Sequence, residues 1–220
     1  MTAESMTAGS ATTRKLVVIS SGVGAPSSTR MLADRLTAAT IEQLREQHGI
    51  EVQASVHELR DTAKDVVNNL VTGFPAPKLA EVIEAVAGAD GLIIVTPVFN
   101  ASFNGLFKSF LDVIDPDALR GLPTLIGATG GSPRHSQVLD YAMRPVLTYM
   151  HADVLTTGVY AATEDWAGRA DDSLPSLPDR IARAGVELAA RVAVTDRSST
   201  VTDPFALDGS FSVTGGFSAE

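Results

Sequence analysis

Short apolar or alternating runs follow one another along this chain, separated by longer stretches in which apolar residues recur three and four positions apart. The short runs are expected to be strands and lie at 15–20, 49–59, 92–95, 122–128 and 154–160. The longer stretches are expected to be helices and lie at 29–48, 60–71, 78–87, 103–111, 136–150 and 177–193. This alternation of strand and helix predicts an α/β domain with a parallel sheet.

The number of expected strands limits which α/β fold the chain can adopt. Five strands connected by helices favour a flavodoxin-like, doubly wound parallel sheet of order 2-1-3-4-5, with helices on both faces, over the six-stranded dinucleotide fold. The central run Leu92–Val95 has four apolar residues without alternation, as expected of a strand covered on both faces. We expect residues 14–195 to form this domain, between a flexible N-terminus at 1–13 and a flexible tail at 196–220.

Composition disfavours several classes of function. The 220-residue chain has no cysteine, so neither a disulfide nor a thiolate site is possible. Its net charge of −9 disfavours nucleic acid or an anionic membrane as the principal partner, because both require a basic surface. No apolar run is long enough to span a bilayer, and we expect a soluble, cytoplasmic protein. His57 has no ligand partner at suitable spacing, so we expect no metal site.

The loop between the first strand and the first helix, residues 21–28, combines glycines, a proline and hydroxyls. Free backbone N–H groups and the positive end of the following helix dipole suit an anion. An ordinary turn in which Ser27 or a neighbour only caps the helix fits equally well. The loop lacks the Gly-Lys-Ser/Thr ending of a nucleoside-triphosphate site, and Gly22 and Gly24 alone make a poor dinucleotide fingerprint. A flavin mononucleotide phosphate, bound without magnesium, would require such a loop.

Two further loops, 96–100 and 129–135, follow the third and fourth expected strands. In parallel sheets, ligands bind outside the carboxyl ends of the strands, where these loops would lie. Adjacent Gly130 and Gly131 would let the backbone approach a flat ligand closely, although a turn that needs positive φ explains them as well. Three such loops at one edge favour a ligand site over coincidence.

Three segments carry a family resemblance: SSG…PSSTR within 20–30, TPVFNASF…LFK…LD within 96–112, and ATGGSPRH…LDYAMRPVL within 128–147. Together they resemble the NAD(P)H-dependent FMN reductases of the flavodoxin-like fold. The similarity is greatest to reductases that supply reduced flavin to two-component monooxygenases of the sulfonate-utilisation and luciferase-like kinds. The resemblance implies hydride transfer from NADPH or NADH to FMN, no side-chain catalyst, a homodimer or homotetramer, and a flavin monooxygenase as partner.

The same resemblance implies which residues contact FMN. They are, for the phosphate, Ser21, Gly22, Ser27, Ser28, Thr29 and Arg30; for the isoalloxazine, Pro97, Val98, Phe99 and Asn100; and for its pyrimidine edge, Thr129, Gly130, Gly131 and Ser132. His135 would approach the ring or the nicotinamide, and the candidates for a 2′-phosphate contact are Arg30, Arg134 and Arg144. The chain departs from many relatives at Ser21-Gly22, where Gly-Ser is common, and at Phe99, where tyrosine is common.

Two other functions remain open. A flavoenzyme of the same fold could retain FMN and reduce a quinone, an azo dye or a metal ion. A non-enzymatic electron carrier could bind FMN without oxidising NAD(P)H, although flavodoxins are typically shorter and lack the pattern at 129–145.

The expected helix at 136–150 and the C-terminal segment add two structural expectations. Tyr141 is expected either at a subunit contact or buried within the monomer. Pro145 should kink its helix or relieve its hydrogen bonding. The segment from Thr195 has isolated phenylalanines without a period, as in a flexible tail or a segment that docks on a partner subunit.

Overall fold

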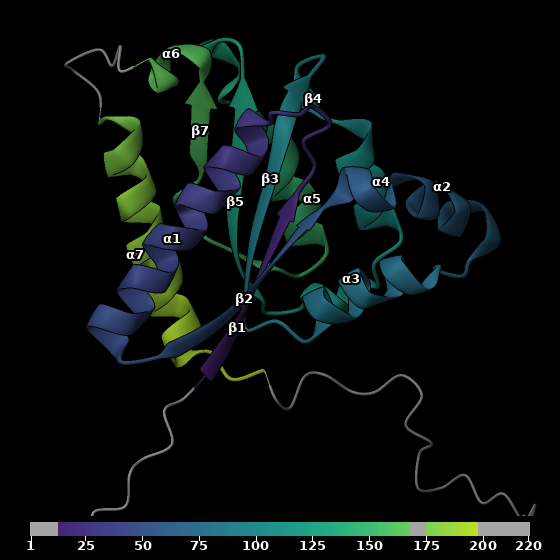
Figure 1. Ribbon diagram of the computed structural model, residues 1–220, viewed down its shortest axis with the longest axis horizontal. Helices are drawn as coiled ribbons and strands as arrows, with labels where there is room; N and C mark the ends of the chain where they lie inside the picture. The colour runs from purple at the N-terminus through teal and green to yellow at the C-terminus, as the bar shows by residue number, and fades with distance from the viewer. Residues whose placement is uncertain (1–12, 168–174, 198–220) are drawn as a thin grey trace, which may run out of the picture.

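Residues 13–167 and 175–197 are the described part of a computed structural model, and they form one sheet between two layers of helices (Figure 1). The strands are β1 (Thr13–Ser20), β2 (Glu51–Glu58), β3 (Gly91–Phe99), β4 (Ser102–Phe103), β5 (Pro123–Gly130), β6 (Asp153–Val154) and β7 (Val159–Ala162). The α-helices are α1 (Ser28–His48), α2 (Ala63–Thr72), α3 (Pro77–Ala87), α4 (Gly105–Asp112), α5 (Arg144–Tyr149), α6 (Thr163–Trp166) and α7 (Leu177–Val194). Three short 3₁₀ turns and one π turn complete the described elements: η1 (Leu59–Thr62), η2 (Pro116–Leu119), η3 (Pro133–His135) and the π turn η4 (Leu139–Met143).

The sheet order is β2-β1-β3-β5, and both β6 and β7 pair with the outer side of β5. All of these pairs are parallel, which confirms the α/β, flavodoxin-like prediction. The finer prediction of five strands in the order 2-1-3-4-5 is wrong. The fifth position is divided between two strands, and the two-residue β4 pairs antiparallel with β3.

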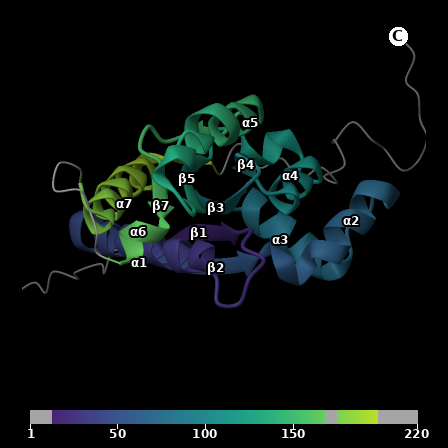
Figure 2. The same ribbon diagram turned by 90° about the horizontal axis from the view of Figure 1, so that it is seen from above.

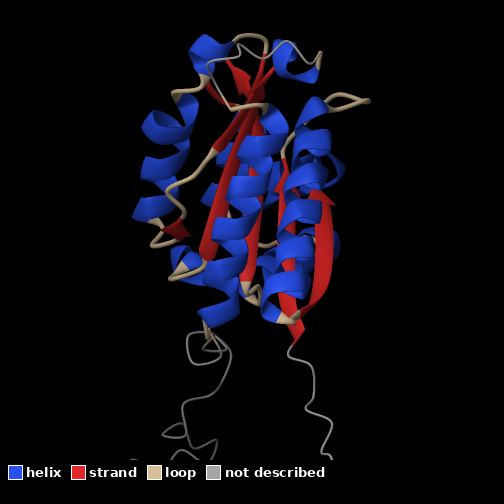
Figure 3. Ribbon diagram, turned by 90° about the vertical axis from the view of Figure 1, so that its left-hand side faces the viewer, coloured by secondary structure: helices blue, strands red, loops and turns tan. Residues whose placement is uncertain are grey.

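Helices cover both faces of the sheet, as Figures 2 and 3 show. Helices α1 and α7 pack on one face, over a core that includes Ile93 and Leu188. Helices α2, α3 and α4 and the segment from η4 to α5 cover the other face, where Ile94, Phe107 and Phe110 are buried. Adjacent residues of β3 therefore enter different cores. The run 92–95 has no polar position because both of its faces are buried.

Two side chains from the flanking helices bind the backbone between β6 and β7, where the expected strand is broken. The carboxylate of Glu187 accepts hydrogen bonds from the backbone N–H groups of Thr156 (2.8 Å) and Thr157 (3.2 Å). The guanidinium of Arg144 donates to the backbone carbonyls of Leu155 (2.7 Å) and Thr156 (3.1 Å). These bonds satisfy backbone groups between the two strands. The strand expected at 154–160 is therefore interrupted.

The connection after β3 differs from the expected loop at 96–100. The strand continues through Phe99, and Val98 and Phe99 pair with the two residues of β4. Asn100 and Ala101 form the two-residue turn, with positive φ values of 49° and 65°, as a type I′ hairpin requires. The next helix starts at Gly105 rather than Phe103, because the side chain of Asn104 caps it by accepting the N–H of Phe107 at 2.8 Å.

The prediction for Pro145 is confirmed, since the π turn η4 precedes it and relieves the regular hydrogen bonding of the helix. Arg197 is 5 % exposed and donates to the backbone carbonyls of Ala89 (2.6 Å) and Ala118 (2.7 Å). Of the segments expected to be flexible, Thr13 belongs to β1 and residues 196–197 are described, and the remainder lies outside the described residues. None of the helices in the described ranges is long and apolar enough to cross a membrane.

Candidate functional site

The carboxyl ends of β1, β3 and β5 meet at one edge of the sheet, at the top of Figure 1, and bring the three predicted loops together. A hydrogen bond of 2.9 Å joins the buried hydroxyls of Thr29, which directly follows the first loop in α1, and Thr129, where the third loop starts. The side-chain amide of Asn104 donates to the backbone carbonyl of Ser21 at 2.6 Å and joins the first loop to the connection after β3. The three loops thus form one hydrogen-bonded edge.

The first loop ends at the N-terminus of α1. The hydroxyl of Ser27 accepts a hydrogen bond from the backbone N–H of Arg30 (3.2 Å) and caps the helix. The N–H groups of Ser28 and Thr29 lie in the first turn, where a helix offers them no acceptor. A Cβ at Gly22 would lie 2.2 Å from the Ser27 hydroxyl oxygen, so this position needs glycine. Helix capping and anion binding are therefore compatible, because the cap uses one N–H and leaves two.

Two of the predicted phosphate contacts have side chains that face the protein interior. Ser21 is fully buried, and both its N–H (2.9 Å) and its hydroxyl (3.3 Å) donate to the backbone carbonyl of Val95. Thr29 is 2 % exposed, and its hydroxyl is engaged with that of Thr129. Ser28, between the cap and Thr29, is exposed. The hydroxyls of Ser21 and Thr29 hold the loops together, whereas that of Ser28 faces the surface.

Charged side chains lie beside the first loop. Arg30 pairs with Asp34 (2.7 Å) and Glu58 (3.0 Å), and the hydrogen bond from its guanidinium to Asp34 raises the pKa of Arg30. Arg60 donates to the backbone carbonyl of Gly24 at 2.8 Å and also pairs with Glu58 at 3.2 Å. Both arginines are thus paired with carboxylates, since Arg60 also lies 3.8 Å from Asp61, and Arg60 alone of the two reaches the loop itself. Within the described ranges, no group of three His, Asp or Glu side chains could hold a metal ion.

The β3–β4 hairpin forms the second side of the edge. Pro97 and Val98 are half-buried at the end of β3, whereas Phe99 is 47 % exposed and Asn100 is exposed at the turn. The backbone N–H of Asn104 donates to the hydroxyl of Thr96 at 3.3 Å, which fixes the base of the hairpin. The aromatic ring of Phe99 and the amide of Asn100 are therefore exposed on a hairpin whose base is fixed.

The third loop is held by Tyr160 of β7. The Tyr160 hydroxyl donates to the backbone carbonyl of Ser132 at 2.8 Å, and the residue is 5 % exposed. Burial raises the pKa of Tyr160, so this hydroxyl remains a donor at neutral pH. A Cβ at Gly130 would lie 2.2 Å from the hydroxyl oxygen, whereas a Cβ at Gly131 would have no heavy atom within 4 Å. Gly130 makes room for Tyr160, and Gly131 faces open space.

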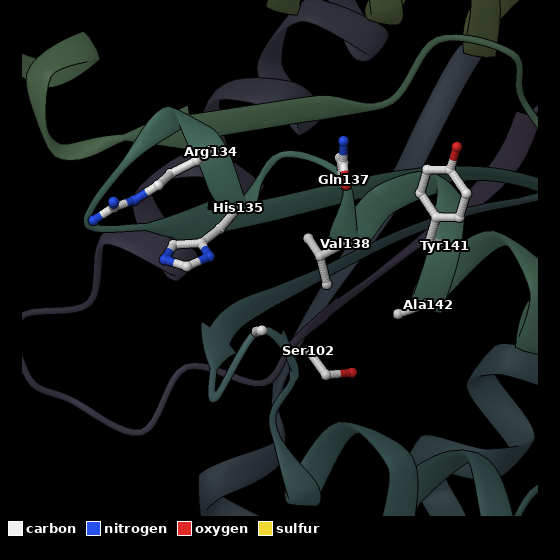
Figure 4. Close-up of a pocket in the computed structure, with 8 residues that line it drawn as sticks. Ser102, Arg134, His135, Gln137, Val138, Tyr141 and Ala142 are labelled. Carbon is white, nitrogen blue, oxygen red and sulfur yellow. The ribbon is translucent and has the colours of Figure 1, made fainter.

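A pocket of about 330 Å³ adjoins the hairpin and the third loop (Figure 4). Its lining includes Ser102 of β4 and, from the segment after β5, Arg134, His135, Gln137, Val138 and Tyr141. Arg134 is exposed and His135 is half-buried. Tyr141 is 80 % exposed, so of the two expectations for this residue, burial within the monomer is wrong.

Comparison with known proteins decides the family. The family model of the NADPH-dependent FMN reductases matches residues 14–167. The chain belongs to this family. It is 36 % identical over 152 residues to an FMN reductase (NADPH) of Pseudomonas aeruginosa, covering 69 % of this chain and 78 % of that protein. It is 35 % identical over 153 residues to an NADH-dependent FMN reductase of Pseudomonas fluorescens, covering 70 % of this chain and 79 % of that protein.

Solved structures of two oxidoreductases show the same fold. An oxidoreductase from Corynebacterium diphtheriae superposes with a TM-score of 0.78 at 44 % identity, covering 84 % of this chain and 99 % of that one. The apo form of the NADH:FMN oxidoreductase EmoB superposes with a TM-score of 0.71 at 29 % identity, covering 85 % of this chain and 93 % of that one. The sheet edge described above is thus set in an FMN reductase fold.

Three residues that shape this edge of the reductase fold are absent from the sequence prediction. Asn104 could have been found, because an asparagine directly before an apolar helical pattern is a typical N-cap. Arg60 follows the carboxyl end of β2, so the strand pattern also predicts that Arg60 lies at this edge of the sheet. Tyr160 gives no local signal, because it acts on a carbonyl 28 residues earlier in the chain.

Proposed function

We propose that this protein binds FMN across the three loops and transfers hydride to it from NAD(P)H. The observation that carries the proposal is the construction of the sheet edge. Buried hydroxyls and Asn104 tie the loops to one another, and unpaired donors and open backbone remain on their outer side. Membership of the FMN reductase family supports the same reaction.

The N-terminus of α1 suits the FMN phosphate. The N–H groups of Ser28 and Thr29 are without helical acceptors, and the 21-residue helix presents the positive end of its dipole there. The exposed hydroxyl of Ser28 can add a further donor, and Arg60, which is also paired with Glu58 and Asp61, contacts the loop at the backbone carbonyl of Gly24. We assign phosphate contact to these groups and a positioning role to the side chains of Ser21 and Thr29.

The hairpin and the third loop suit the isoalloxazine ring. Phe99 and Val98 offer apolar surface, and Asn100 offers an amide at the hairpin turn. The open space at Gly131 lets a flat ring approach the backbone, whose N–H groups can donate to ring carbonyl oxygens. FMN itself supplies the hydride-accepting chemistry when bound. The chain orients the ring and shields one of its sides, and we assign no side chain as acid or base.

We infer further that reduced FMN leaves this protein and serves a flavin monooxygenase of the luciferase-like or sulfonate kind. Exposure of Phe99, Asn100 and Gly131 supports exchange of the flavin. Exposed apolar side chains at the end of α2, Val71 at 83 % and Phe74 at 80 %, support a homodimer or homotetramer that would cover them. We place the protein in the cytoplasm, where the NAD(P)H that it oxidises is found.

The test is NAD(P)H oxidation by flavin-stripped protein, followed by the loss of near-ultraviolet absorbance, with and without added FMN or riboflavin. We expect saturable oxidation that depends on free flavin. Riboflavin lacks the phosphate, so Ser28→Ala should raise the KM for FMN and leave that for riboflavin unchanged. Equal effects on the two flavins would contradict the phosphate assignment.

The same assay separates the other functions that the sequence leaves open. Oxidation that requires a quinone and ignores free FMN, in protein that keeps its flavin, would show a retained-flavin reductase instead. Tight FMN binding without NAD(P)H oxidation would show an electron carrier. Transfer to a partner is tested by adding a two-component flavin monooxygenase and measuring its product. No product despite FMN reduction would contradict the proposed partner class.

A further inference from the structure

The outer edge of β7 lies close to the third loop, and within the described ranges no further strand pairs with it. On its inner side β7 pairs with β5, and Ala162 lies opposite Gly130. The backbone groups on the outer side therefore need partners from outside the sheet. Any group that bonds them also fixes Tyr160, whose hydroxyl holds the third loop at Ser132.

Two charged side chains take the place of a neighbouring strand at this edge. The guanidinium of Arg180, on α7, donates to the backbone carbonyl of Tyr160 and to the carboxylate of Asp165, on α6. The other oxygen of that carboxylate accepts the backbone N–H of Ala162 at 2.7 Å. The Tyr160 carbonyl and the Ala162 N–H are two residues apart and point to the same side of the strand. One ion pair thus supplies the donor and the acceptor that an adjacent strand would supply.

The ion pair is partly removed from water. The side chains of Arg180 and Asp165 are 23 % and 15 % exposed. An exposed ion pair contributes little, whereas a pair that is largely buried and bonded to backbone groups loses more when one partner is removed. Burial and, after it, the charge of Asp165 raise the pKa of Tyr160, so its hydroxyl stays protonated and able to donate. The pair therefore acts on both the carbonyl and the hydroxyl of Tyr160.

We propose that Arg180 and Asp165 are positioning residues for the flavin, because they fix the end of β7 and, through Tyr160, the third loop on which the ring binds. The proposal rests on the proposed placement of the isoalloxazine ring on that loop. The pair should determine how tightly the ring is bound, and not how fast hydride reaches it. FMN and riboflavin share this ring, so the pair should affect both flavins equally, unlike the phosphate contacts of the first loop.

Trp166 offers a signal from this part of the molecule. It is the only tryptophan of the chain, it is half-buried, and it directly follows Asp165 in α6, which lies beside the end of β7 in Figure 1. The guanidinium of Arg35, on α1, lies 4.8 Å from the centroid of its ring. Because α6 has only four residues, loss of the bonds to Asp165 should release it from β7. Trp166 would then be more exposed, and its fluorescence would shift to longer wavelength.

The first experiment measures the KM for FMN and for riboflavin in variants of the pair. We expect Arg180→Ala to raise both about tenfold, the usual effect of losing a charged hydrogen bond, with kcat unchanged. Arg180→Lys should recover part of this loss, because it keeps the charge without the planar fork that reaches both partners. Combining Arg180→Ala with Asp165→Ala should add little to the more severe single change. Arg183→Ala, which removes an exposed arginine of the same helix, should change neither KM.

The second experiment requires no turnover. It records Trp166 fluorescence in the flavin-free protein and the binding of riboflavin, followed by quenching of the flavin fluorescence. We expect Arg180→Ala to shift the tryptophan emission to longer wavelength and to weaken riboflavin binding by the same factor as its KM. Arg180→Lys and Asp165→Asn, which keep part of the bonding, should show smaller changes of the same kind. They provide the same comparison if Arg180→Ala does not fold.

The outcomes separate the role of the pair from the placement of the ring. A folded Arg180→Ala protein with wild-type KM for both flavins, a KM raised for FMN alone, or a lowered kcat with unchanged KM would each overturn the proposal. Gly131→Ala is the reference, because its methyl group enters the space proposed for the ring. If Gly131→Ala weakens both flavins and Arg180→Ala neither, only the role of the pair is overturned. If neither variant weakens riboflavin, the placement of the ring is overturned as well.

Discussion

Two sets of residues at the same edge of the sheet look alike in the sequence and differ in the structure. The inner set is buried and hydrogen-bonded within the protein, and it consists of Ser21, Thr29, Asn104 and Thr129. The outer set is exposed, and it consists of Ser28, Phe99, Asn100 and Gly131. This difference shows that residue type and strand position predict where a site lies. The hydrogen bonds of each group determine whether that group holds a loop in place or faces a ligand.

The largest effect on stability is expected at Asn104. Replacement by alanine removes the cap of α4 and leaves the buried carbonyl of Ser21 without this donor, so Asn104→Ala should reduce the free energy of unfolding by about 2–4 kcal/mol. Urea unfolding measures this loss. Asn100→Gly, in the outer set, keeps the positive φ of the turn and should cost little stability. Similar losses in the two variants would erase the distinction between inner and outer residues.

The two adjacent glycines offer a matched test within one loop. A methyl group at Gly130 would displace the buried Tyr160 hydroxyl, so Gly130→Ala should cost about 1–3 kcal/mol and raise the KM for FMN. Gly131→Ala meets no neighbouring atom and should leave the melting temperature unchanged, while its methyl group intrudes on the space proposed for the ring. Thermal unfolding and FMN kinetics together separate the two roles. A Gly130→Ala protein as stable as the wild type would show that Tyr160 is not held by this contact.

The two hydroxyls at the start of α1 give a smaller contrast. Thr29→Val removes the bond to Thr129 and keeps the shape of the side chain, so it should lower the free energy of unfolding by about 1 kcal/mol. Ser28→Ala should leave the free energy of unfolding within about 0.5 kcal/mol of the wild type, as surface substitutions usually do. Chemical unfolding of both variants provides the measurement. Loss of stability in Ser28→Ala and none in Thr29→Val would reverse the proposed roles.

The smallest effect is expected at His57 of β2, which belongs to neither set. Burial lowers the pKa of His57, so the unfolded chain binds this proton more readily than the folded protein. The contribution to stability is therefore present above the unfolded pKa of about 6.5 and is lost as the pH falls below it. Melting temperatures measured on either side of this value should fall less on acidification in His57→Gln than in the wild type. An identical fall in both would contradict the shifted pKa.

Much of the fold is predictable from the sequence because hydrophobic periodicity reports directly on burial. The run 92–95 is a strand buried on both faces, and the long helix after the first loop begins at Ser28, one residue before its expected start. The hairpin at Asn100 is not predicted from the sequence, because its turn lacks the glycine that usually marks positive φ. The break after β6 is not predicted from the sequence, because it depends on Arg144 and Glu187, which lie in helices elsewhere in the chain.

The sequence predicts which loops form the candidate site, but it does not predict the separate roles of residues within a loop. Strand ends and glycine- and hydroxyl-rich segments place the three loops at one edge, because parallel strands share the direction of their carboxyl ends. The separate roles of Gly130 and Gly131 depend on Tyr160, whose position follows from the packing of β7 beside β5. A prediction from local sequence cannot include such a contact, because the contact exists only after the sheet has formed.

The divided strand at the end of the sheet also bears on how the protein behaves at high concentration. A long exposed edge strand is a template on which another chain can add a strand and start aggregation. Here the outer position holds only two residues in β6 and four in β7. Backbone groups between them are already bonded to Glu187 and Arg144. The interruption therefore protects the edge of the sheet against intermolecular pairing.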